Sequence, residues 1–103
     1  MVLVTADSFP GGGRFEGRES VSAFAEDFEA AWEDIRYEVA DPRMVEGAVV
    51  HRARWAVRGK ESQVPVNLDV FGVVRMDGEA VASLELFWDE AEAVERARSG
   101  AAP

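Results

Sequence analysis

The chain has 103 residues, 48% of them hydrophobic, which is enough for one domain with a single core and too little for a second domain. Its 20 acidic and 11 basic residues give a net charge of −9, which opposes binding to nucleic acid and to anionic membrane surfaces. With no cysteine and one histidine, the chain is predicted to hold no disulfide, no metal and no other cofactor. The sequence shows neither a signal peptide nor a membrane-spanning apolar run, so we predict a cytoplasmic protein.

The first third of the chain is predicted to contain a strand, a loop and a helix. Val2 to Thr5 can form a short strand, and Phe9 to Gly13, with one proline and three glycines, is predicted to be a loop. From Val21 to Ile35, apolar residues recur every three or four positions, and acidic residues occupy the other side. This pattern predicts an amphipathic helix with an acidic outer face, in which Ser20 accepts hydrogen bonds from the first free amides.

The rest of the chain is predicted to be an antiparallel meander followed by a short helix. Apolar and polar residues alternate along it, and Glu46-Gly47 and Asp77-Gly78 are typical of tight turns between strands. Asp41-Pro42 is expected to form a bulge, and Asp89 to begin the last helix as its N-cap. The predicted strands cover residues 35–45, 48–58, 64–75 and 80–88, the helix 90–98 and a frayed tail 99–103.

Several short motifs follow one another along the chain in a fixed order. They are Phe15-Glu16-Gly17-Arg18-Glu19-Ser20-Val21 at the helix start, Trp32 near its end, Val64-Pro65-Val66, Asp77-Gly78 and Trp88-Asp89-Glu90-Ala91-Glu92-Ala93. In this order they resemble a SnoaL-like domain of the nuclear-transport-factor-2-like superfamily, over residues 9 to about 97. The resemblance implies an α+β fold: a curved antiparallel sheet of four main strands, one amphipathic helix on its concave face and a short C-terminal helix, in a cone-like, cystatin-like roll.

The sequence departs from that family at its N-terminus. Family members usually begin with helices that close the cone, and no such helix precedes Phe9. A single helix about 10 Å wide cannot cover four strands spaced about 4.8 Å apart. We therefore expect either that a second copy of the chain covers the rest of the sheet, giving a homodimer, or that the sequence lacks residues upstream of Met1.

Strand register predicts which side chains share the apolar face of the sheet. A four-residue loop between the second and third long strands would place Trp55 opposite Val66 and His51 opposite Val70. A three-residue turn at Met76–Gly78 would continue the same face into the last strand. We expect this face to meet the helix, forming either a plain core or an aromatic ligand pocket. The candidate ligand-binding residues are Phe24, Phe28, Trp32, His51, Trp55, Leu68 and Trp88.

Two groups of residues are candidates for catalysis. His51 lies on the apolar face and could act as a general base or orient a ligand carbonyl, the alternative being a partly buried histidine satisfied by one hydrogen bond. On the other face the predicted register aligns Arg52, Asp69 and Glu85, with Asp41 nearby. Carboxylates around an arginine can form an acid/base site, as the resemblance to family epoxide hydrolases suggests, but a solvated row of salt bridges is the alternative.

Three functional hypotheses follow. The first is a domain that binds an apolar small molecule between sheet and helix, as a homodimer. The second is an enzyme of the cyclase, isomerase or hydrolase type, with His51 or Asp69 as its base. The third is a noncatalytic accessory protein whose exposed sheet face binds a partner subunit. Neither nucleic acid nor a membrane is an expected partner.

Overall fold

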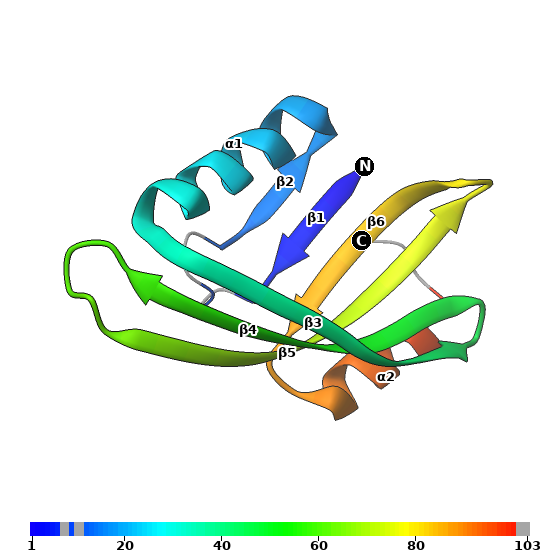
Figure 1. Ribbon diagram of the computed structural model, residues 1–103. Coiled ribbons are helices and arrows are strands. Elements are labelled where there is room, and N and C mark those ends of the chain that lie inside the picture. The colour runs from blue at the N-terminus through cyan, green and yellow to red at the C-terminus, as the bar shows by residue number, and fades with distance from the viewer. Residues whose placement is uncertain (7–8, 10–11, 101–103) are drawn as a thin grey trace.

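A computed structural model describes residues 1–6, 9 and 12–100 of the chain, so Pro10 and Gly11 of the predicted loop and residues 101–103 of the predicted tail lie outside the described residues. The fold is one curved six-stranded sheet with a helix against each face (Figure 1). The elements are β1 (Val2–Thr5), β2 (Arg14–Glu16), α1 (Gly17–Ala31), β3 (Trp32–Val45), β4 (Ala48–Gly59), β5 (Pro65–Asp77), β6 (Ala80–Phe87) and α2 (Glu90–Arg98).

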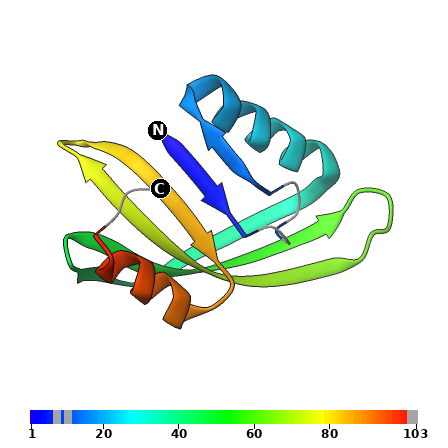
Figure 2. The same ribbon diagram turned by 180° about the vertical axis from the view of Figure 1, so that it is seen from behind.

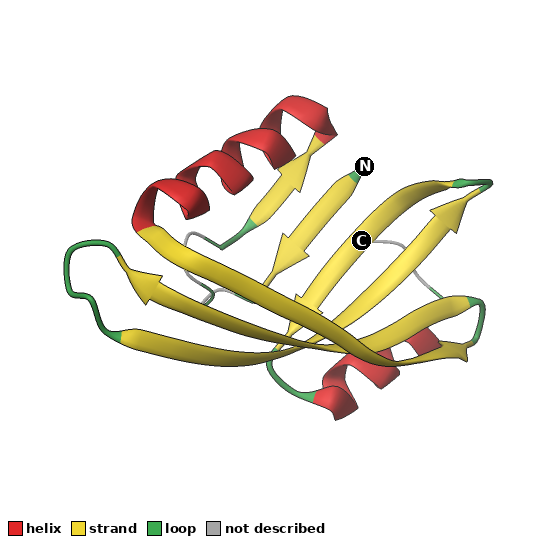
Figure 3. Ribbon diagram, viewed as in Figure 1, coloured by secondary structure: helices red, strands yellow, loops and turns green. Residues whose placement is uncertain are grey.

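The strands are arranged in the order β2-β1-β6-β5-β4-β3. The four long strands β3 to β6 form the predicted antiparallel meander, which dominates the sheet in Figure 3. The short strand β1 was also predicted, but it pairs with β6 in parallel, so the sheet is mixed. Strand β2, at the edge of the sheet, was not predicted, because three residues are too few to show an alternation and two of them, Phe15 and Glu16, stood within the helix-start motif.

Helix α1 begins earlier than predicted. It starts at Gly17, with Glu16 in the capping position, so Ser20 lies inside the helix and the prediction that it caps the helix was wrong. The Gly17 amide instead donates to the Met1 carbonyl over 2.9 Å, so the residue that precedes β1 satisfies one of the free helix amides. Helix α2 begins as predicted, because the Asp89 side chain accepts a hydrogen bond from the Ala91 amide.

Each helix closes a separate hydrophobic core. On the concave face α1 covers a cluster whose buried members are Leu3, Phe9, Phe24, Phe28, Val57, Val70 and Leu86. On the convex face α2 covers a smaller cluster with buried Ala48, Val50, Val73, Ala93 and Ala97. Figure 2 shows α2 lying against the face opposite to α1. The buried Phe9 was not anticipated, because the sequence places it at the start of a glycine-rich loop.

Two connections between strands differ from their predicted lengths. Trp55 pairs with Leu68 rather than Val66, because the connection after β4 is longer than predicted. The β5–β6 turn is not the predicted three-residue turn: Asp77 pairs with Ala80, and a bulge follows in the ladder next to Arg75. The β4–β5 register is displaced by an even number of residues, which leaves every side chain on its predicted face. In the β5–β6 pair the bulge offsets the change in turn length, so the same side chains still share the apolar face.

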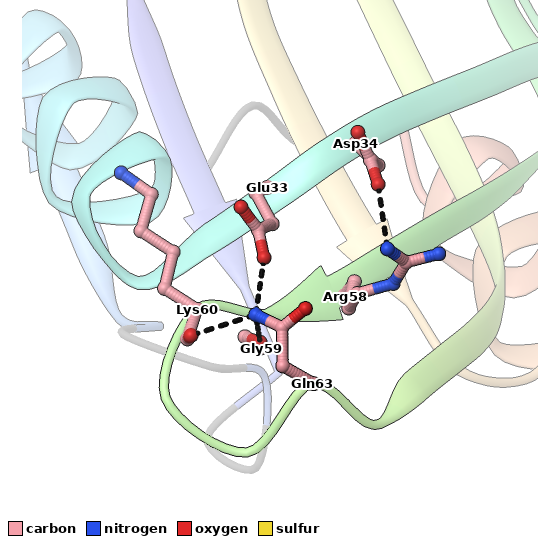
Figure 4. A network of polar contacts seen from close by, with 6 residues as sticks. All are labelled: Glu33, Asp34, Arg58, Gly59, Lys60 and Gln63. Atoms are coloured by element: carbon pink, nitrogen blue, oxygen red, sulfur yellow. Dashed lines mark hydrogen bonds and ion pairs between the residues drawn. The ribbon is translucent and has the colours of Figure 1, made fainter.

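Polar contacts join the start of β3 to the end of β4 and to the β4–β5 connection (Figure 4). The Gln63 amide nitrogen donates to the Glu33 carboxylate and to the Lys60 carbonyl. Arg58 pairs with Asp34 over 3.1 Å. The Lys60 amide also donates to Ala31, the last residue of α1. These contacts hold the junction at which α1 passes into β3.

Candidate functional site

An open groove of about 310 Å³ lies between α1 and the concave face of the sheet. It is lined by Leu3, Val21, Phe24, Ala25, Phe28, Glu29, Ile35, Tyr37 and Trp55. Glu29 is the one charged residue among these, and the others are aliphatic or aromatic. The volume of the groove falls at the small end of the range for ligand pockets, about 300 to 1,000 Å³. The arrangement favours a small apolar molecule.

The helical wall of the groove follows from the spacing of α1. Val21, Ala25 and Glu29 recur every four residues, so they form one flank of the helix. Phe24 and Phe28 lie between this flank and the core and are each 8% exposed. Glu29 belongs to the acidic positions that the sequence pattern assigned to the outer face, and the structure instead places it at the edge of the groove.

The opposite wall consists of a cross-strand aromatic pair. Tyr37 on β3 lies directly opposite Trp55 on β4, with 6.2 Å between the ring centroids. Trp55 also makes an edge contact with Phe28 of α1, at 5.3 Å and an interplanar angle of 89°. Tyr37 is 68% exposed, whereas Phe28 is buried, so the wall runs from solvent to the core. The sequence places Tyr37 in an alternating strand. It does not predict the neighbour Trp55, because that pairing depends on the β3–β4 register.

The structure brings some of the predicted ligand-binding residues to this groove and leaves others elsewhere. Phe24, Phe28 and Trp55 line it. The remaining aromatic and aliphatic candidates, Trp32, Leu68 and Trp88, pack against the concave core cluster instead.

Part of the concave face extends beyond α1 and is apolar. One cross-strand row runs Met44, Val49, Val74 and Leu84, ending at Leu3 on β1. At the β3 edge and near the β5–β6 turn, large side chains are exposed: Tyr37 68%, Val39 57%, Met44 68%, Met76 51% and Val81 41%. We call these five residues the open apolar face. They adjoin the groove through Tyr37.

His51 lies on the concave face as predicted, but outside the groove lining. It is opposite Gly72 in the ladder, and its ring occupies the space that a Cβ at Gly72 would take. Its imidazole forms no hydrogen bond with any described residue, so the one hydrogen bond expected in the alternative, a partly buried structural histidine, is not found there. Burial lowers the pKa of His51, which favours the neutral imidazole, the form that can accept a proton.

The predicted row of Arg52, Asp69 and Glu85 is not formed. Asp69 lies opposite Arg54 and pairs with it over 3.1 Å, and both side chains are 55% exposed on the convex face. Arg52 lies opposite Phe71, and Glu85 opposite Val73. The row was wrong because both predicted registers were displaced. Asp41 sits in the predicted bulge of β3, between Ala40 and Arg43, with a φ of 53°.

Glu85 instead lies buried beneath α2. Its side chain is 2% exposed, and its Oε2 forms an ion pair with Nε of Arg96 over 3.3 Å. Its other oxygen, the Ser83 hydroxyl and Nε of Arg75 are buried without a hydrogen-bond partner among the described residues. Burial raises the pKa of Glu85, while the positive charges of Arg96, Arg75 and Arg14 oppose the rise. This cluster lies across the sheet from the groove.

Among the described residues, no group of three or more histidine, cysteine or carboxylate side chains has a metal-binding arrangement. No helix in the described ranges is long and apolar enough to cross a membrane.

Comparison with known proteins identifies the fold. No family model and no curated protein matches the sequence. Among solved structures, a Burkholderia thailandensis NTF2-like protein aligns with a TM-score of 0.78 at 15% identity, over 94% of this chain and 75% of that one. A Catenulispora acidiphila protein with a ketosteroid isomerase-like fold, in complex with trimethylamine, aligns with a TM-score of 0.74 at 16% identity, over 99% and 78%.

A third structure, from Mesorhizobium loti and named as a candidate SnoaL-like polyketide cyclase, aligns with a TM-score of 0.70 at 15% identity, over 84% of this chain and 73% of that one. The chain therefore has the curved α+β fold shared by nuclear-transport-factor-2-like, ketosteroid isomerase-like and SnoaL-like proteins. This confirms the fold that the short motifs predicted.

Proposed function

We propose that this protein is a small-molecule-binding domain that takes an apolar ligand in the groove between α1 and the sheet. The observation that carries the proposal is the lining of the groove, which is aliphatic or aromatic at every position except Glu29. A ligand there would remove apolar surface of both partners from water, at about 25 cal/mol per Å². The complex of a structural neighbour with trimethylamine supports a small-molecule ligand.

The test uses the exposed flank of α1. Ala25 lines the groove and is exposed, so Ala25→Phe fills the groove without removing any core side chain. Ala23→Phe makes the same change at an exposed position of α1 that does not line it. A panel of neutral aromatic ketones, epoxides and lactones is screened by thermal shift, since a ligand at 100 times its dissociation constant stabilises the fold by about 2.7 kcal/mol.

We expect hits with the wild type and with Ala23→Phe, and at least about tenfold weaker binding with Ala25→Phe, which corresponds to 1.4 kcal/mol. Equal binding by all three proteins would place the ligand elsewhere and contradict the proposal. A panel without any hit would contradict it as well.

We also propose that the open apolar face is covered by a second copy of the chain. Tyr37, Val39 and Met44 project along the β3 edge of this face and are more than half exposed, a larger apolar group than isolated surface residues provide. The expected solution mass is therefore twice 11.3 kDa in light scattering at micromolar concentration. Met44→Lys should give the monomer, whereas Val64→Lys, at an exposed residue in the β4–β5 connection, should not. A monomeric wild type would contradict this proposal.

Catalysis is the second candidate function, and His51 is the residue that favours it. Burial lowers the pKa of His51 and so favours the neutral imidazole that a general base needs, and the ring lies on the same face as the groove. In this enzyme hypothesis, His51→Ala abolishes turnover of a groove ligand, while Asp69→Asn, on the convex face, leaves it unchanged. Turnover that survives His51→Ala would end this role for His51.

A further inference from the structure

The groove contains a single carboxylate among apolar residues. Glu29 lies one helical turn beyond Ala25 on the flank of α1 that lines the groove. No basic residue is found among the described residues that line it. An anionic ligand would therefore meet a like charge with no cation to offset it, and a neutral ligand would leave Glu29 unused.

The walls beside Glu29 present aromatic rings. Phe24, Phe28, Tyr37 and Trp55 all contribute to the lining, and the Tyr37 and Trp55 rings are neighbours at 6.2 Å. The face of an aromatic ring carries negative potential, so it attracts a cation within about 6 Å of its centroid, and tryptophan does so most strongly. Several rings together with one carboxylate form the combination that recognises alkylated ammonium groups.

The charge of the surrounding surface has the same sign. Helix α1 carries four acidic side chains, Glu19, Glu26, Asp27 and Glu29, against one basic side chain, Arg18. The whole chain has a net charge of −9. Such a field raises the local concentration of small cations and repels anions.

We propose that the groove is selective for a small apolar cation, an alkylated ammonium joined to an apolar body, over a neutral molecule of the same shape. The apolar body lies against Phe24 and Phe28, and the ammonium group lies between Glu29 and the Tyr37 and Trp55 rings. This inference rests on the proposed function, because it names the ligand class of the same groove.

The test compares two isosteric probes, benzyltrimethylammonium and neopentylbenzene, which differ in that a charged nitrogen replaces a neutral carbon. Their dissociation constants are measured by titrating the tryptophan fluorescence of the protein. We expect the cation to bind about tenfold more tightly at low ionic strength, from the cation–π and carboxylate contacts together. The ratio should fall when ionic strength rises from about 0.01 M to about 1 M, because the Debye length shortens from about 30 Å to about 3 Å.

Variants separate the local contact from the general field. Glu29→Gln should reduce the preference for the cation at least about threefold, whereas Glu26→Gln, which removes the same charge from α1 outside the groove lining, should leave it nearly unchanged. Tyr37→Phe keeps the aromatic face and should retain the preference, and Tyr37→Leu should weaken it.

The outcomes distinguish the two proposals. Equal or tighter binding of neopentylbenzene, lost in Ala25→Phe, would overturn the inference and leave the proposed function standing. An equal loss of preference in Glu29→Gln and Glu26→Gln would also overturn it, because the selectivity would then come from net charge alone. Failure of both probes to bind would overturn the inference and weaken the proposed function with it.

Discussion

The imidazole of His51 lies directly over Gly72, its partner on the next strand. A Cβ added at Gly72 would lie 2.3 Å from Cε1 and 2.6 Å from Nε2 of His51. The absence of a side chain at Gly72 therefore gives the ring its position on the concave face. Glycine usually weakens a strand, and here its place in β5 is explained by the close approach of this ring.

Gly72→Ala is expected to destabilise the protein by about 1 kcal/mol, because the His51 ring must rotate out of the space that the new methyl group takes. In a His51→Ala background the same substitution should be neutral or stabilising by up to about 0.5 kcal/mol, since alanine restricts the unfolded chain more than glycine does. Urea denaturation of the four proteins of this double-mutant cycle gives the coupling between the two sites. Equal costs in both backgrounds would show that the ring does not occupy this space.

Glu85 should make the stability of the protein depend on pH in a defined direction. Its pKa in the folded protein is raised by burial above the ordinary 4.5, so the folded state binds the proton more tightly than the unfolded chain does. The resulting stabilisation is fully present below pH 4.5 and is lost as the pH rises through the raised pKa. Glu85→Gln keeps the shape and stays neutral, so it should be more stable than the wild type at pH 7 and should lose that advantage below pH 4.5.

The measurement is urea denaturation of wild type and Glu85→Gln at several pH values. Glu92→Gln, which removes one charge from an exposed position of α2, controls for the change in net charge. A wild type that is more stable than Glu85→Gln at pH 7 would show that the ion pair with Arg96 outweighs the burial of the carboxylate.

The sequence predicted best where a periodic pattern is long. Strands β3 to β6 each extend over eight or more residues, and their alternation located them to within a few positions. The three residues of β2 carry no such pattern, and the helix cap came from a distant backbone carbonyl at Met1 instead of a nearby serine. Contacts between distant segments are not encoded in local spacing.

The candidate sites were predicted less well than the fold, for two physical reasons. When the register of two strands is displaced by an even number of residues, each side chain keeps its face of the sheet but gains a different neighbour. Asp69 therefore lies on the predicted face, beside Arg54 instead of Arg52. The groove depends on how α1 is tilted over the sheet, which no periodicity specifies. Glu29 and Tyr37 were therefore assigned to a helix surface and to a strand, without any indication that both line one groove.

Phe9 is expected to be a large contributor to stability, although it lies in a loop segment. It is 3% exposed, and its ring lies within 6.4 Å of four other aromatic rings, those of Phe24, Phe28, Trp55 and Trp88. Phe9→Ala should cost about 3–5 kcal/mol and Phe9→Leu less than about 1.5 kcal/mol. Urea denaturation gives both values, with the partly buried Phe15→Ala as the milder control. A cost below about 1 kcal/mol for Phe9→Ala would show that the ring does not pack in the core.

The ion pair between Arg54 and Asp69 is expected to contribute little to stability. Both side chains are 55% exposed, so water screens the pair, and the long arginine side chain loses conformational freedom when the pair forms. Asp69→Asn and Arg54→Gln should each change the free energy of unfolding by less than about 0.5 kcal/mol, and a double-mutant cycle should give a coupling of about the same size. Ligand binding in the groove should be unchanged, because the pair lies on the opposite face of the sheet. A coupling above about 1 kcal/mol, or weaker ligand binding by Asp69→Asn, would contradict the assignment of this pair to a solvated surface and would restore Asp69 as a candidate functional residue.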